Sequence, residues 1–174
     1  MNEVVSKVKY WMNVASNDHV QVGTKIGITQ SCHGKAAPLK RMHKGDWLIH
    51  YSPKEHFQGN ESCKKFTSLG QVSDNKIYQF DMGNDFIPWR RNINYLDIRP
   101  VSILNLLETL SFTKGKGKHW GMVFRFGFFE IPESDFKFLY KEMAGLDFLT
   151  TNKHPFLDCL GKEDSKTLEI ICQR

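Results

Sequence analysis

The chain has 174 residues, of which 40% are hydrophobic and 25% are charged, with a formal net charge of +5. This composition is typical of a single globular domain; it excludes a disordered or fibrous chain, and no apolar run is long enough to span a membrane. Because residues 145–174 contain four Lys or Arg against five Asp or Glu, residues 1–144 carry +6. The positive charge therefore belongs to the body of the domain, which is compatible with a polyanionic partner.

The N-terminal half is predicted to alternate short strands and short helices. Ser16 or Asn17 is placed to cap the first helix, and Pro38 and Gly45 are typical of the start and end of the second. The predicted order is strand, helix, brief strand, helix and half-buried strand, at 7–16, 18–25, 27–29, 38–45 and 46–52.

The C-terminal half continues this pattern after a loop at 53–64. Asp74-Asn75 predicts a hairpin turn between two strands, and Gly145 is expected to end the last helix. The predicted order is two strands, a third strand, a helix, a strand and a helix, at 65–74, 76–82, 90–98, 99–112, 120–131 and 131–145. Short strands interleaved with short helices favour an α+β barrel over a doubly wound sheet.

Several sequence blocks, taken in order, resemble one family of small domains. They are YWMNVAS, HV, GITQSCHGK, LKRMHKGDWLIHYSPK, FTSLGQV, PWRRNINYL and HWGMVFRFGFFEIPESDF. Over about residues 10–144 the chain is similar to the EVE-domain (UPF0310) proteins. This resemblance implies an α+β, PUA-like mixed β-barrel with short peripheral helices, related to the YTH domains that read methylated adenine in RNA. We expect residues 1–144 to form this EVE/PUA-like domain and residues 145–174 to form a C-terminal appendage of unknown role.

The resemblance also implies a function. Members of this group are thought to bind nucleic acid, often by taking one modified base into a pocket. The sequence departs from the better-studied branch at Ile26, which precedes Gly27 where a Trp is common, so an aromatic cage is not carried over there. Since extruding a base from a duplex costs a few kcal/mol, we expect RNA or DNA that is single-stranded or locally opened.

Eight residues are candidates for a base-binding pocket at the barrel mouth. An amide can pair with a base edge, a glycine lets the backbone approach a ligand, and an aromatic ring can stack on a base. The candidates are Gln30, His33, Gly34, Lys35, Tyr51, Ser52, Trp89 and Arg90. The alternative is structural, with Tyr51 and Trp89 in the core and the loop side chains bonded to nearby backbone.

A second set of residues is expected to contact phosphates. Residues 30–56 contain five Lys or Arg against two acidic residues, and residues 114–118 alternate three lysines with two glycines. The candidates are Lys40, Arg41, Arg91, Lys114, Lys116 and Lys118. The alternative is that these cations belong to solvated surfaces. Arg90 and Arg91 are neighbours on a strand and must point to opposite faces, so at most one lines the pocket.

The sequence offers no pattern typical of an enzyme. No nucleophile with an oriented base, metal-ligand spacing or cofactor motif is found, so we expect no catalytic residues, metal or cofactor. The four widely spaced cysteines and the lack of a leader-like start predict a cytoplasmic protein. The main alternative is a nucleotide-binding or small-molecule-binding protein, or an enzyme, using the same pocket. A further alternative is a module that binds an acidic protein.

Overall fold

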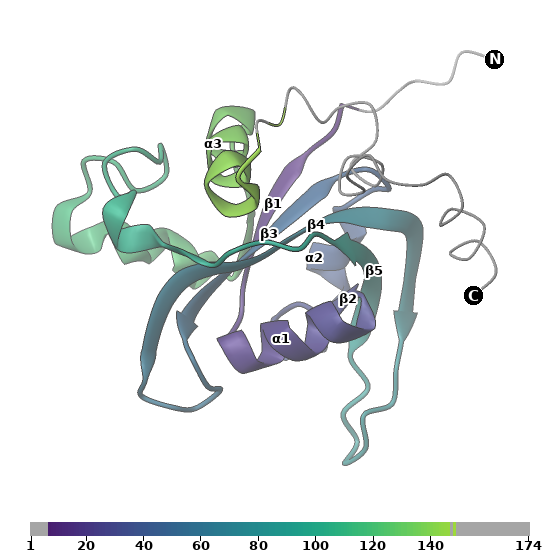
Figure 1. Cartoon of the computed structure of the whole chain (residues 1–174). Coiled ribbons are helices and arrows are strands. Elements are labelled where there is room, and N and C mark those ends of the chain that lie inside the picture. The colour runs from purple at the N-terminus through teal and green to yellow at the C-terminus, as the bar shows by residue number, and fades with distance from the viewer. Residues whose placement is uncertain (1–6, 147, 149–174) are drawn as a thin grey trace, which may run out of the picture.

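The fold is a curved, mixed sheet with helices on both faces, as defined by a computed structural model that describes residues 7–146 and 148 (Figure 1). The strands are β1 Tyr10–Val14, β2 Ile28–Thr29, β3 Trp47–Lys54, β4 Ser62–Gln79, β5 Trp89–Tyr95, β6 Val101–Ser102 and β7 Phe128–Glu130. Their order is β2-β5-β4-β3-β1-β7, with β6 paired to β4. β1 and β3 are parallel, and the other pairs are antiparallel. The predicted α+β class is confirmed, but no pairing among the described strands joins β2 to β7, so the sheet is open.

Helices and 3₁₀ segments cover the sheet on two sides. They are α1 Asn17–Ile26, η1 Cys32–Gly34, α2 Ala36–Lys40, η2 Ile103–Asn105, η3 Gly117–Phe126 and α3 Glu133–Ala144. Figure 1 shows α1 and α3 on opposite faces of the sheet. None of the helices in the described part of the chain is long and apolar enough to span a bilayer.

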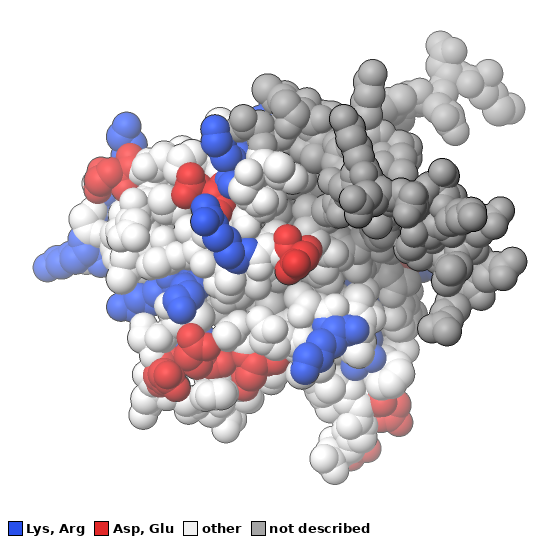
Figure 2. All heavy atoms as spheres, viewed as in Figure 1, with Lys and Arg blue, Asp and Glu red and all other residues white. Residues whose placement is uncertain are grey.

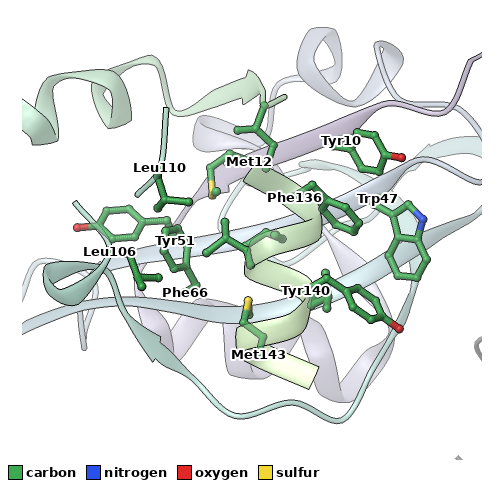
Figure 3. Close-up of a cluster of buried hydrophobic side chains, with 14 of the residues drawn as sticks. Tyr10, Met12, Trp47, Tyr51, Phe66, Leu106, Leu110, Phe136, Tyr140 and Met143 are labelled. Atoms are coloured by element: carbon green, nitrogen blue, oxygen red, sulfur yellow. The ribbon is translucent and has the colours of Figure 1, made fainter. Parts of the chain in front are cut away.

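The larger core lies between α3 and the sheet (Figure 3). Phe136 of α3 stacks on Tyr10 of β1 at a centroid distance of 4.4 Å, and Tyr140 meets the edge of Trp47 at 5.7 Å. Burying a side chain such as Phe136 stabilises the fold by about 1.5–3 kcal/mol. A smaller core lies under α2 and contains Trp11, Leu39, Met42, Leu48, Val72, Ile93 and Phe128.

Two predicted helix ends, at Ser16 and Gly145, are confirmed, although the Ser16 side chain makes no capping hydrogen bond. Helix α1 begins directly after Ser16. Gly27, predicted as the first residue of the following strand, instead ends α1 in the left-handed conformation, and its N–H donates to the Thr24 carbonyl at 3.3 Å. Gly145 ends α3 in the same conformation, with its N–H donating to the Lys141 carbonyl. The ends at Ser16 and Gly145 depend on local chemistry, which is why the sequence predicts them.

The hairpin predicted at Asp74-Asn75 is wrong, because these residues form a bulge inside the single long strand β4. Asp74 Oδ1 accepts from the Lys76 N–H at 2.8 Å, and Asp74 Oδ2 accepts from Asn92 Nδ2 of β5 at 2.9 Å. The local turn chemistry is therefore present, but the cross-strand bond to Asn92 keeps the strand paired with β5 on both sides of the bulge.

Two other predicted elements are wrong in type. Residues 99–112, predicted as a helix, contain β6, η2 and turns, although Ile103, Leu106 and Leu110 are buried at helix-like spacing. Residues 120–131, predicted as a strand, mostly continue η3, and only Phe128–Glu130 pair with β1. Helix α2 is also shorter than the predicted 38–45. Short 3₁₀ segments bury side chains without either regular period, so periodicity misassigns them.

The proposed boundary at residue 144 stays a prediction. Apart from Gly145, Leu146 and Phe148, the predicted C-terminal appendage lies outside the described residues. The Phe148 ring contributes to the larger core, where it meets the edges of Trp47 and Tyr140.

Candidate nucleic-acid interface

A hairpin loop at 80–88 joins β4 to β5 and folds against η1. Backbone bonds close it: the Phe80 N–H donates to the Pro88 carbonyl at 3.1 Å, and the Met82 N–H donates to the Phe86 carbonyl at 3.0 Å. Gly34 of η1 lies against Pro88 with φ +66°, and a Cβ at Gly34 would be 2.7 Å from Pro88 Cβ. This close approach requires a residue without a side chain and fixes the loop beside η1.

The loop exposes four large apolar side chains close together in sequence. Phe80, Met82, Phe86 and Ile87 are each between 44% and 51% exposed; we call these four residues the hairpin patch. A single exposed apolar residue is ordinary, but several gathered on one loop indicate a surface that binds something.

The side chain of Arg90 lies against the Phe80 ring of this patch. Its guanidinium carbon lies 3.8 Å from the centre of the Phe80 ring. The Gln30 side-chain carbonyl accepts from Arg90 Nε at 2.9 Å and from Nη2 at 3.2 Å, and the same amide end lies 3.6 Å from the sulfur of Met82. An aromatic ring, a guanidinium and an amide from three separated segments therefore converge, and planar groups of this kind stack on and hydrogen-bond to heterocycles.

A buried polar network inside the sheet supports the backbone at Gln30. Asn13 Nδ2 donates to the Gln30 carbonyl at 2.9 Å and lies 3.1 Å from His50 Nε2. His50 Nδ1 lies 2.7 Å from the Ser68 hydroxyl. Burial lowers the pKa of His50 to about 4, so its ring is neutral at pH 7 and Nε2 accepts from Asn13. These contacts fix the position of β2 and of the segment that follows it.

Five of the predicted base-binding residues come together at this place: Gln30, His33, Gly34, Lys35 and Arg90. His33 and Lys35 are exposed on either side of Gly34. The prediction that Gly34 lets a ligand approach the backbone is wrong. Gly34 does allow a close approach, but the group that approaches it is Pro88 of the same chain. The contacts predicted for the other four residues remain predictions.

The stacking role predicted for Tyr51 and the donor role predicted for Ser52 are wrong. The Tyr51 ring is buried in the larger core (Figure 3). It stacks on Phe124 at a centroid distance of 3.9 Å. Ser52 is fully buried, and its hydroxyl lies 2.7 Å from the Thr67 hydroxyl. Both side chains already have partners inside the protein, because β3 is covered on both faces and leaves neither residue at a rim.

Trp89 and Arg91 point away from the hairpin patch, so the predicted stacking by Trp89 beside Arg90 is wrong. Trp89 packs against the smaller core under α2. Arg91 is buried on that same side, where Nη1 donates to the Leu39 carbonyl at 3.0 Å and Nη2 to the Asp74 carbonyl at 2.8 Å. Strand alternation separates them from Arg90, as expected for neighbours on β5. Arg91 is only 2% exposed, so the predicted phosphate contact by Arg91 beside Gln30 and Arg90 is wrong.

The remaining predicted phosphate contacts are dispersed. Lys40 is exposed at the end of α2, and the exposed Arg41 lies over the Trp11 ring at 4.7 Å. The segment 114–118 lies on the side of the molecule away from the hairpin loop (Figure 1), so its lysines do not converge with Gln30. Figure 2 shows Lys and Arg interspersed with Asp and Glu on the visible face. The basic excess is therefore not gathered on that face.

Sequence reasoning missed the hairpin patch. The signal was present: Phe80, Met82, Phe86 and Ile87 surround Gly83-Asn84, a turn-forming pair, and apolar residues that flank a turn this closely cannot all reach a core. The turn was assigned to Asp74-Asn75 instead, which placed Phe80 and Met82 inside a strand.

Comparison with known proteins identifies the family. The sequence model of the EVE-domain family matches residues 9–142 of this chain. A UPF0310 protein of Bacillus licheniformis is 49% identical over 129 residues, covering 74% of this chain and 87% of the relative. One from Mycolicibacterium vanbaalenii is 41% identical over 134 residues, covering 77% and 92%. The chain belongs to the EVE-domain family.

A solved structure shows the same fold. It is the YTH domain of Zygosaccharomyces rouxii MRB1 in complex with N6-methyladenosine RNA, with a TM-score of 0.54 and 16% identity. The similarity covers 81% of this chain and 87% of that one. The expected fold relationship to YTH domains is confirmed.

Proposed function

We propose that this domain binds single-stranded nucleic acid and recognises one base, including modified bases, at the hairpin patch and the Gln30–Arg90 pair. The base stacks on the exposed rings, the amide and guanidinium meet its polar edge, and Lys35 contacts an adjacent phosphate. The domain thereby acts as a binding module and not as a catalyst.

The observation that carries this proposal is the position of Phe80 over Arg90 at 3.8 Å, with Gln30 bonded to the guanidinium. A half-exposed ring backed by a buried cation is a rigid stacking surface, since Arg90 has little freedom left to lose on binding. The loop also carries Asp81 and Asp85, both exposed, so charge alone does not explain an attraction to polyanions here. Stacking must supply much of the base affinity.

The relationship to a YTH domain supports the choice of ligand class. That domain was solved with an N6-methyladenosine RNA, and the shared fold makes such an RNA a sensible first probe for this chain. The base read by this domain is then set by its own residues, since its hairpin patch contains two phenyl rings and a thioether.

The test is binding of labelled single-stranded oligonucleotides, followed by fluorescence anisotropy, with adenosine or N6-methyladenosine at one central position. Phe80→Ala should weaken binding by roughly five- to 150-fold, because base stacking contributes about 1–3 kcal/mol. Phe126→Ala is the matched control: Phe126 is 76% exposed and lies on η3, away from the hairpin loop, so its loss should leave affinity unchanged.

A second variant separates base contacts from phosphate contacts. Lys35→Gln should weaken binding of all sequences alike. It should also reduce the slope of log affinity against log salt concentration by about 0.7, the value of one phosphate contact on a single strand.

Equal losses of affinity in Phe80→Ala and Phe126→Ala, or no loss in either, would contradict base stacking at the hairpin patch.

A further inference from the structure

A separate pocket lies on the opposite side of β5 from the hairpin patch. It has a volume of about 210 Å³ and lies between α2 and the bulge of β4. Its lining residues are Lys40, Met42, His43, Asn75, Ile77 and Arg91. This lining contains two permanent cations and a histidine but no carboxylate. Since a water molecule occupies about 30 Å³ in the liquid, the pocket has room for a tetrahedral oxyanion.

Arg91 is the unusual member of this pocket. It is only 2% exposed, and among the described residues its Nε–H has no hydrogen-bond partner. Its two Nη groups donate to the backbone carbonyls of Leu39 and Asp74, which are neutral acceptors. Buried charges in proteins are normally paired, and a buried N–H without an acceptor is destabilising.

The nearest carboxylates do not neutralise this charge. Asp74 accepts from Asn92 and from the Lys76 N–H, while Asp46 accepts from Trp11 Nε1 at 2.9 Å and from the backbone. Neither forms an ion pair with Arg91 within the described part of the chain. Burial lowers the pKa of Arg91, and the more distant Asp74 and Asp46 offset this only in part. Among the described residues the Arg91 charge therefore has no directly bonded counter-ion.

From this geometry we infer that the pocket binds a phosphate group, which Lys40 and His43 contact at its mouth and the Arg91 guanidinium contacts at its base. Guanidinium and ammonium groups together are the usual phosphate ligands of proteins. The site is independent of base recognition at the hairpin patch, because it lies on the other face of β5. The phosphate is either part of a nucleic-acid backbone that passes around β2 or a free phosphate group.

The probe is inorganic phosphate, titrated into the full chain at constant ionic strength with chloride as the balancing anion. Binding is followed by NMR at the Arg91 Nε–H, which reports on the pocket itself. We expect a saturable shift of this signal and, for Lys40→Gln, an affinity about tenfold lower, as for the loss of one charge-assisted contact. Lys44→Gln is the matched control, because Lys44 is an exposed cation four residues away that does not line the pocket.

Absence of a saturable shift, or equal effects of Lys40→Gln and Lys44→Gln, would overturn the inference. Arg91 itself is left unchanged in these variants because its hydrogen bonds to the Leu39 and Asp74 carbonyls stabilise the fold.

A single-stranded oligonucleotide added to the phosphate complex then identifies the source of the phosphate group. Displacement of phosphate assigns the pocket to a backbone phosphate, whereas binding without displacement assigns it to a free phosphate group. If oligonucleotides do not bind at all, the proposed function fails while the phosphate shift still decides this site.

Discussion

Gly34→Ala tests whether the contact between η1 and the hairpin loop is as close as the structure shows. At φ +66° an alanine destabilises the native state by about 1–2 kcal/mol through its backbone conformation alone. Its Cβ would also lie 2.7 Å from Pro88 Cβ and 2.8 Å from Pro88 Cα. These atoms belong to a rigid ring and backbone, so their displacement costs about 1–3 kcal/mol more. We expect a total loss of about 2–5 kcal/mol.

The assay is the free energy of unfolding from urea denaturation, with Gly115→Ala as the control. Gly115 has φ +72°, but a Cβ there has nothing within 4 Å, so this variant isolates the backbone contribution. Gly34→Ala should therefore lower the free energy of unfolding by about 1–3 kcal/mol more than Gly115→Ala does, because only Gly34→Ala brings a Cβ against Pro88. If the two variants lose the same free energy, the hairpin loop does not press on η1 and the reasoning about the site's rigidity is refuted.

Two further predictions concern the interior. The pKa of His50 is about 4 in the native protein, against an ordinary value of 6.5. Between pH 6.5 and pH 4 the imidazole is therefore protonated in the unfolded chain but neutral in the native protein. The free energy of unfolding should be constant above pH 6.5 and fall by up to about 3 kcal/mol as the pH drops to 4. His50→Gln should lack this pH dependence in urea denaturation. If the variant shows the same pH dependence, another group is responsible. Tyr51→Leu should lower the free energy of unfolding by about 1–3 kcal/mol while the folded protein keeps its oligonucleotide affinity, and a selective loss of affinity would restore Tyr51 to the binding site.

The sequence predicts the features that depend on local chemistry. Ser16 and Gly145 mark the start of α1 and the end of α3, and the strands predicted at 46–52 and 90–98 are found as β3 and β5, although β3 is buried on both faces and not half-buried. The opposite directions of Arg90 and Arg91 also follow from alternation alone. The resemblance to a known family supplied the fold that these elements build.

What could not be predicted depends on contacts between distant residues. The Asp74 side chain accepts a local hydrogen bond typical of a turn, but the segment forms a bulge because Asn92 of β5 also bonds to Asp74 and keeps it in the sheet. Tyr51 looks like a rim residue at the end of a strand, yet η3 brings Phe124 against its ring. Phe80 becomes part of a site only because Arg90 and Gln30 lie beneath it. Periodicity and composition carry no information about these pairings.

The most direct test of base recognition is NMR mapping of a single-stranded oligonucleotide with one N6-methyladenosine on the full chain. We predict that the largest shifts fall on the Gln30 amide, the Arg90 Nε–H and the backbone of residues 80–88, with smaller shifts at Lys35. Shifts confined to the lysines of segment 114–118, with Gln30 and residues 80–88 unmoved, would contradict base recognition and leave only non-specific attraction between charges.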